Sequence, residues 1–187
     1  FDPSAVIGGK LPLTGTNGIV GHSEHMVCEA CEFCDHFLQL SPDIAVILNV
    51  DEDHLEYFKN LDNIKQSFAK FASMATKAAI YIVAAAETDG KQLITFGLGE
   101  KNNFRAVNIT SSREYDSYDL VKDGEKLGKV TLSVPGEHNV YNSLAVIAAA
   151  MLTGADFEQC VKGIEDFHSA GRRFENLADI PGDSPPV

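Results

Sequence analysis

Two short segments of the chain place acidic residues or a histidine directly after an apolar run. Residues 47–58 read ILNVDEDHLEYF, where the apolar run is followed by Asp51, Glu52, Asp53 and His54. Residues 27–31 read VCEAC and carry Glu29. A carboxylate and an imidazole that converge from neighbouring strand ends can hold a cation, and oxygen-rich surroundings favour Mg²⁺, although histidine is an unusual Mg²⁺ ligand. Spacing alone leaves Glu29 and His54 either ligands or ordinary loop residues.

The acids before His54 have a second interpretation. Asp51, Glu52 and Asp53 precede a short predicted helix. Acidic side chains stabilise a helix N-terminus by accepting backbone N–H groups and by opposing the positive end of the helix dipole. For these three residues the sequence favours capping over metal ligation.

Three cysteines are spaced as CxxCxxC, at Cys28, Cys31 and Cys34. The ferredoxin pattern needs a further cysteine four residues later, and position 38 is leucine. Only Cys160 or His36 could complete a tetrahedral thiolate site. The sequence therefore favours reduced cysteines that serve as small packing residues in a cytoplasmic protein, with a thiolate metal site as the alternative.

The composition excludes several classes of protein. The chain has 187 residues, of which 44% are hydrophobic and 22% charged, and its formal net charge is −12. No apolar run approaches the roughly 20 residues of a membrane helix. The negative charge argues against nucleic acids and anionic membranes as partners, and a bound nucleotide should bring a cation with it. The chain begins with Phe1, so we expect it to be a piece of a longer protein.

Continuous apolar runs predict the central strands of a parallel sheet. Runs at 44–50 and 77–86 are apolar on both faces, as in strands covered by helices on each side. Between them, apolar residues recur at helical spacing, namely Leu61, Ile64, Phe68, Phe71 and Met74. Residues 44–86 therefore predict a βαβ unit, and residues 23–30 predict a further strand.

The second half of the chain has a different pattern. Residues 91–134 alternate in short segments separated by turn residues, including KDGEKLG, and predict antiparallel hairpins. A helix should begin after Pro135-Gly136 and end at Gly154, and another should cover 156–168. The predicted fold class is α/β, a mostly parallel sheet flanked by helices with a smaller antiparallel β-hairpin region. Ligands in such sheets bind outside the carboxyl ends of the strands, where Glu29 and His54 lie.

Four motifs in order resemble one protein family. These are VIGGKLPLTGTNGIVG, EACEFCDHFLQLSPDIAVILNVDEDHLEYFKNL, VPGEHNVYNSLAVIAAA and GRRFE. Together they resemble the ATP-binding central domain of the Mur ligases, cytoplasmic enzymes that build the peptide stem of bacterial peptidoglycan. The resemblance implies ATP and Mg²⁺ as cofactors and UDP-N-acetylmuramate and L-alanine as substrates, joined by an amide bond through an acyl phosphate. A ligase that recycles a ready-made tripeptide shares parts of the pattern.

The resemblance also implies roles for individual residues. Glu29 and His54 would hold Mg²⁺, and Arg173, or its neighbour Arg172, would reach the phosphates. Three residues at the start of a helix would meet the adenine: His138, Asn139 and Asn142. Without the resemblance, the two asparagines would be ordinary polar residues of a helix start. The arginines would be solvated surface charge.

The chain departs from the family in one large respect. The phosphate-binding pattern GxxGK[ST] is absent, and Lys10 in IGGKLPL is no substitute because leucine follows it. We expect residues 1–170 to be an incomplete central domain and 171–187 to begin the next domain or a linker. Alone, the chain should lack ligase activity and expose a sheet edge that favours dimerisation. The rival classes are a thiolate metal-binding module and a non-catalytic interaction domain of the same fold.

Overall fold

The computed structural model describes residues 1–10, 14–81, 92–112 and 115–168. The chain divides into two compact units, which are described separately. The smaller unit contains residues 1–29 and the segment from 168 onward, and the larger unit contains residues 30–167.

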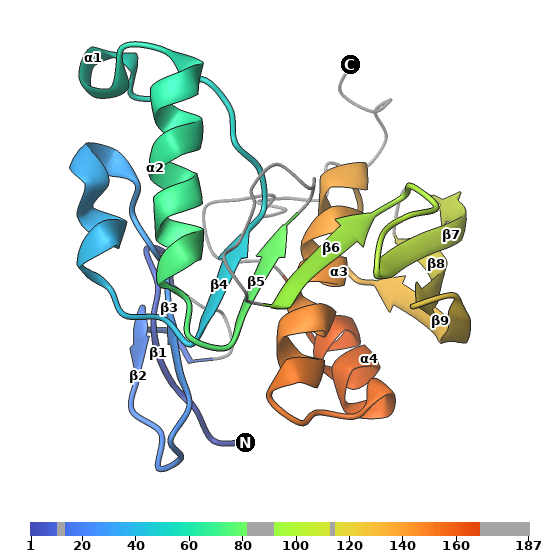
Figure 1. Cartoon of the computed structure of the whole chain (residues 1–187). Helices are drawn as coiled ribbons and strands as arrows, with labels where there is room; N and C mark the ends of the chain where they lie inside the picture. Colours follow the sequence, from blue (N-terminus) through green and yellow to red (C-terminus); the bar gives the residue numbers. More distant parts are fainter. Residues whose placement is uncertain (11–13, 82–91, 113–114, 169–187) are drawn as a thin grey trace, which may run out of the picture. The chain divides into compact units, whose positions relative to one another are not determined.

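The smaller unit contains a sheet in the order β2-β1-β3 (Figure 1). Its strands are β1 (Ser4–Val6), β2 (Gly18–Ile19) and β3 (Met26–Cys28). β1 is antiparallel to β2 and parallel to β3. The predicted strand at 23–30 is therefore present over its central three residues.

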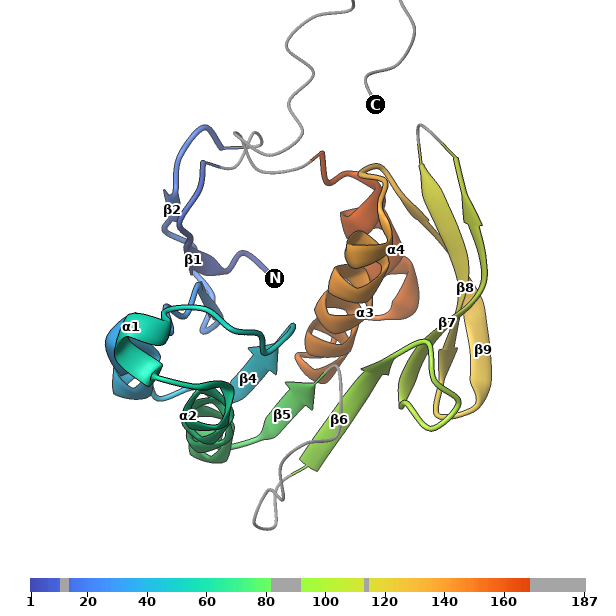
Figure 2. The ribbon, with the colours of Figure 1, turned by 90° about the horizontal axis from the view of Figure 1, so that it is seen from above.

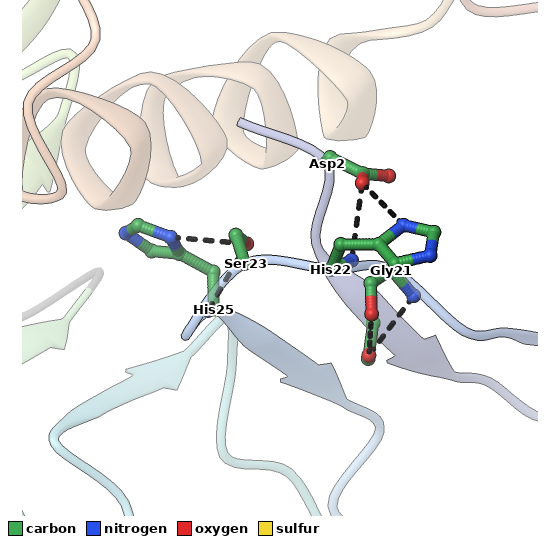
Figure 3. Close-up of polar contacts among 6 residues, drawn as sticks. Asp2, Gly21, His22, Ser23 and His25 are labelled. Carbon is green, nitrogen blue, oxygen red and sulfur yellow. Dashed lines mark hydrogen bonds and ion pairs between the residues drawn. The ribbon is translucent and has the colours of Figure 1, made fainter.

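Polar contacts fasten the loop between β2 and β3. Figure 3 shows the Asp2 carboxylate accepting the backbone N–H of His22 at 3.0 Å and lying 2.9 Å from its ring Nδ1. Ser23 Oγ lies 3.4 Å from His25 Nδ1 and accepts the His25 backbone N–H at 3.2 Å. These two histidines thus have local partners within the smaller unit.

The larger unit contains a mixed sheet in the order β4-β5-β6-β7-β8-β9 (Figure 1). The pairs β4–β5, β5–β6 and β6–β7 are parallel, whereas β7–β8 and β8–β9 are antiparallel. The strands are β4 (Ile44–Ile47), β5 (Ala78–Tyr81), β6 (Gln92–Gly97), β7 (Phe104–Ser111), β8 (Asp116–Lys122) and β9 (Glu125–Leu132). This α/β arrangement confirms the predicted fold class.

Helices cover both faces of this sheet. Figure 2 shows α2 on one face and α3 on the other. The helices are the 3₁₀ helix η1 (Phe33–Gln39), α1 (Leu55–Phe58), α2 (Leu61–Met74), α3 (Glu137–Leu152) and α4 (Phe157–Glu165). Because β4 and β5 are adjacent and parallel with α2 between them in sequence, the predicted βαβ unit is confirmed as far as residue 81.

One part of the prediction for residues 91–134 is wrong. β6 is not a hairpin strand, because it pairs in parallel with both β5 and β7. The predicted turn at Asp123-Gly124 does join the antiparallel strands β8 and β9, and both of its residues have positive φ, 49° and 88°. That backbone suits a two-residue hairpin turn with glycine in second place.

Two apolar cores form on the two faces of the sheet. On β5, Ala79 belongs to the core under α2, and its neighbour Ile80 belongs to the core under α3. In the first core Phe37 of η1 stacks on Phe71 of α2, with ring centroids 4.8 Å apart. Each fully buried side chain of this size contributes roughly 1.5–3 kcal/mol. On β5, Ala78, Ala79 and Ile80 are thus buried on both faces, as the sequence predicts, whereas on the edge strand β4 Val46 is 38% exposed.

Helix caps set the starts of α2 and α4. Asn60 accepts the backbone N–H of Asn63 at 2.9 Å. Asp156 and Gln159 form a reciprocal capping box at the start of α4. Such caps are typically worth about 1 kcal/mol each. Among the helices described, none is long and apolar enough to cross a membrane.

Candidate active site

His54 lies between three carboxylates in the larger unit. Its Nε2 is 3.7 Å from Glu32 Oε1, and its Nδ1 is 3.5 Å from Glu56 Oε1 and 3.8 Å from Asp53 Oδ1. His54 directly precedes α1 and has a left-handed backbone, with φ 51°. The Phe33 ring meets the imidazole edge-on, with centroids 5.0 Å apart. Three acids around one imidazole create a negative local field that attracts a cation.

Glu32, Asp53 and His54 form the group that we call the His54 cluster. One possible ligand atom from each lies within 4.8 Å of the others. Adjacent ligands of an octahedral Mg²⁺ are about 3 Å apart and opposite ligands about 4.2 Å apart, so side-chain rotation would have to bring at least two of the three pairs to about 3 Å for all three to contact one ion. Two carboxylate oxygens and an imidazole are suitable donors for a divalent cation. The His54 cluster therefore fits the Mg²⁺ site that the family resemblance implies.

The acids before His54 do not cap α1, so that part of the sequence interpretation is wrong. The N-cap residue is His54, and it makes no side-chain capping bond. Asp51 Oδ1 accepts the N–H of Glu52 at 2.8 Å, and Asp53 Oδ1 accepts the N–H of His54 at 2.7 Å. Each carboxylate thus accepts the backbone N–H of the next residue in the loop rather than one in α1. Asp53 is also part of the His54 cluster.

Glu29, the predicted partner of His54, belongs to the smaller unit and follows β3. Its carboxylate accepts the backbone N–H of Gly8 at 2.5 Å, and a Cβ at residue 8 would lie only 2.9 Å from Glu29 Oε1. Because Glu29 and His54 lie in units that are described separately, their pairing stays a prediction. Glu32, which the sequence interpretation did not single out, is the glutamate that lies 3.7 Å from His54 within the larger unit.

The second group of predicted site residues lies at the start of α3. Asn139 and Asn142 are half-buried and His138 is exposed. Asn139 Nδ2 donates to Pro135 O at 3.0 Å, and Asn142 Nδ2 makes a long contact of 3.4 Å to Asn139 Oδ1. Both asparagines lie at the start of a helix, as predicted, and their contact puts them on one side of it. Their role in binding adenine stays a prediction.

Buried polar contacts fix the start of α3 on the sheet. Asp116 of β8 is 2% exposed, and its Oδ2 accepts the N–H of Gly136 at 2.7 Å. Gly136 has φ 120°, a backbone region that favours glycine. Two turns after Gly136, Ser143 Oγ lies 2.8 Å from the hydroxyl of Tyr118, and burial raises the pKa of Tyr118. The first turns of α3 are therefore held by the core.

The cysteines do not gather around a metal in the part of the chain that the structure describes. The metal-compatible group found there is the His54 cluster, which contains no cysteine. Cys31 is exposed and Cys34 half-buried, whereas Cys160 packs in the core under α3 and α4. Burial raises the pKa of the Cys160 thiol. Cys160 is thus a packing residue, as predicted. Arg172 and Arg173 lie outside the described residues.

The sequence matches the Mur ligase middle domain over residues 10–150. The chain belongs to the Mur ligase family. It is 41% identical over 97% of its length to the UDP-N-acetylmuramate–L-alanine ligase of Caldanaerobacter subterraneus subsp. tengcongensis, and 40% identical over 94% to the ligase of that name from Clostridium tetani. The chain spans 42% and 40% of these two relatives, about two-fifths of a Mur ligase of this kind.

Solved Mur ligase structures share the fold. The UDP-N-acetylmuramate-alanine ligase of Thermotoga maritima superposes with a TM-score of 0.80 at 28% identity, covering 96% of this chain and 42% of that one. The UDP-N-acetylmuramate:L-alanyl-gamma-D-glutamyl-meso-diaminopimelate ligase of Neisseria meningitides superposes at 0.75 with 22% identity, covering 91% and 59%. The predicted family is thereby confirmed.

Proposed function

We propose that this chain is the ATP-binding central part of a cytoplasmic ligase that joins L-alanine to UDP-N-acetylmuramate in peptidoglycan synthesis. Support comes from relatives of that name at about 40% identity. The observation that carries the proposal is the His54 cluster, which would supply the cation site that an ATP-dependent ligase needs. The family match over residues 10–150 supports assigning 1–170 to the central domain and 171–187 to the next domain or a linker.

The residues of the chain suit phosphoryl transfer rather than nucleophilic catalysis. In the proposed reaction a carboxylate oxygen of UDP-N-acetylmuramate attacks the γ-phosphorus of ATP, and ADP leaves. The alanine nitrogen then attacks the acyl carbon, phosphate leaves, and the nitrogen loses a proton to solvent. Such chemistry depends mainly on positioning and charge neutralisation.

The proposed roles follow the two groups of residues. Glu32, Asp53 and His54 would hold Mg²⁺, which neutralises charge on the phosphates when bound, and Glu29 remains a proposed carboxylate ligand beside them. Asn139, Asn142 and His138 would contact adenine, and Arg173 would contact the phosphates. Residues 1–187 contain no GxxGK[ST] pattern, so we expect them to lack ligase activity by themselves.

Substrate dependence in the intact protein tests this function. ADP release should require ATP, Mg²⁺, UDP-N-acetylmuramate and L-alanine together, and mass spectrometry should find the UDP-N-acetylmuramate-alanine product. ADP release with the tripeptide L-alanyl-γ-D-glutamyl-meso-diaminopimelate but not with L-alanine would instead support the recycling ligase. ADP release with neither acceptor would overturn the proposed reaction.

A further inference from the structure

Two short backbone turns carry the two ends of the His54 cluster. The carbonyl of Glu32 accepts the N–H of Asp35 at 2.9 Å, and the carbonyl of His54 accepts the N–H of Tyr57 at 2.9 Å. Asp35 and Tyr57 are therefore the last residues of turns that begin at Glu32 and His54. A contact between Asp35 and Tyr57 therefore also fixes the position of Glu32 relative to His54.

A single carboxylate makes that connection. The Tyr57 hydroxyl donates to Asp35 Oδ2 at 2.8 Å, and the Ser67 hydroxyl of α2 donates to Asp35 Oδ1. Asp35 thus links η1, α1 and α2, three elements that contact one another in the larger unit (Figure 2). The hydrogen bond with Asp35 raises the pKa of Tyr57. Both Asp35 oxygens accept hydroxyl groups, and Asp35 is not part of the His54 cluster.

The backbone of both turns is strained. Cys34, Asp35 and His54 have φ of 51°, 59° and 51°, the left-handed region that non-glycine residues rarely adopt. Such conformations persist only where surrounding contacts hold them, and they concentrate at functional sites. The bonds to Asp35 are contacts of this kind, because the bond from Tyr57 crosses from one strained turn to the other and the bond from Ser67 ties Asp35 to α2.

We propose that Asp35 is a positioning residue for the metal site: it fastens the turn of Glu32 to the turn of His54 so that their side chains face one ion. The inference rests on the proposed function of the His54 cluster. It predicts that loss of Asp35 weakens the metal site more than it weakens the fold, since Phe37 and Phe71 pack η1 on α2 independently.

Mn²⁺ binding to the intact protein tests the inference, measured by electron paramagnetic resonance and by competition with Mg²⁺. Changes in residues that support metal ligands typically lower affinity by about 10- to 100-fold, and we expect this range for Asp35→Ala. Tyr57→Phe removes one hydroxyl without changing shape and should lower affinity by about 2- to 10-fold. Asp35→Asn keeps one acceptor oxygen, so its Mn²⁺ affinity should lie between those of the wild type and Asp35→Ala.

Asp43→Asn is the matched control. Asp43 also accepts two side-chain donors, from Thr76 and Lys77, but it precedes β4, at the other end of that strand from His54. The Mn²⁺ affinity of the Asp43→Asn variant should stay within about twofold of the wild-type value. Thermal unfolding of each variant checks that the fold is intact. The lost activity of Asp35→Ala should return at high Mg²⁺, which a purely structural defect would not allow.

The outcomes separate the two claims. If Glu32→Gln and His54→Ala weaken Mn²⁺ binding and Asp35→Ala does not, the positioning role of Asp35 is overturned and the metal site stands. If the wild type does not bind Mn²⁺, or if Glu32→Gln and His54→Ala leave binding unchanged, the metal site is overturned and the role of Asp35 with it.

Discussion

The two candidate regions of the larger unit, the His54 cluster and the start of α3, are held in place by different contacts. The side chains of Glu32 and Asp53 are 35% and 75% exposed, and the turns that carry the cluster are joined by hydroxyl–carboxylate bonds. At the start of α3, Val140 and Leu144 are fully buried against the sheet. Core packing of α3 therefore holds its asparagines in place, whereas a few polar contacts hold the turns of the His54 cluster.

From this contrast we expect substitutions in the two regions to have different effects, on the free energy of unfolding in one and on function in the other. Core contacts beneath α3 should govern the free energy of unfolding of the larger unit. Exposed turns with strained backbone contribute little burial, so changes there should act mainly on metal binding and turnover. Variants in each region test this distinction.

The largest effect is expected from Leu144→Ala, in the core beneath α3. Leu144 is fully buried, and truncating a buried leucine typically lowers the free energy of unfolding by about 2–5 kcal/mol. Urea unfolding of the chain measures this change. Val146→Ala is the control, because Val146 is 53% exposed on the same helix and should cost less than about 0.5 kcal/mol. Equal losses would mean that α3 is not anchored by its buried side.

The next largest effect is on turnover, at the His54 cluster. His54→Ala and Glu32→Gln in the intact enzyme should each lower kcat by about 100-fold, close to 2.7 kcal/mol, because each removes a proposed ligand of the Mg²⁺ that would neutralise charge in phosphoryl transfer. The free energy of unfolding should change by less than about 0.5 kcal/mol. Steady-state kinetics and urea unfolding of the same samples test both statements.

Glu29→Gln is the informative comparison for those two variants. Glutamine keeps an oxygen that can accept the N–H of Gly8, so the local structure should survive. We expect Glu29→Gln to lower kcat less than Glu32→Gln does. The reverse order would assign the carboxylate ligand to Glu29, as the family resemblance first implied.

A smaller effect is expected from Asn142→Ala at the start of α3. Within the described part of the chain its amide makes a long contact to Asn139, and if it bonds adenine as proposed, its loss should raise the apparent KM for ATP by about tenfold or less. The KM for L-alanine and the free energy of unfolding should stay nearly unchanged. An effect on L-alanine alone would show that Asn142 serves another substrate.

The sequence predicted the parts of this fold that depend on local periodicity. The residues of β5 are apolar because they face two cores, Ala79 the core under α2 and Ile80 the core under α3, and the spacing of Ile64 and Phe71 marks the buried side of α2. β6 was misassigned because alternation shows which face a strand buries, not the direction of its neighbours. Its parallel pairing is set by long-range packing of Ile94 and Phe96 in the core under α3.

The site was harder to predict for a similar reason. Glu29 and Glu32 are three residues apart in EACE, and spacing alone does not distinguish which of them would be a metal ligand. What brings Glu32 to His54 is the left-handed backbone at Cys34 and Asp35 and the bond from Tyr57, which is 22 residues away in sequence. Residue types can suggest a carboxylate–histidine site, but which carboxylate lies beside His54 in the larger unit depends on tertiary contacts.

The smallest effect is expected at Asp43, before β4, where two strand starts are tied by polar contacts far from the chemistry. The Thr76 hydroxyl and then the Lys77 ammonium hold the pKa of Asp43 below its usual value of 3.8. A carboxyl group with a lowered folded-state pKa contributes stability above its unfolded pKa and loses it as the pH falls through the folded value. The difference in unfolding free energy between wild type and Asp43→Asn should therefore be small and constant from about pH 7 to about pH 5, and should shrink below about pH 4. Urea unfolding of both proteins across this range measures it. Because Asp43 is exposed, salt should weaken the Lys77 part of the effect. A difference that grew toward acid pH would mean that the Asp43 carboxylate is destabilised in the fold, contrary to its contacts with Thr76 and Lys77.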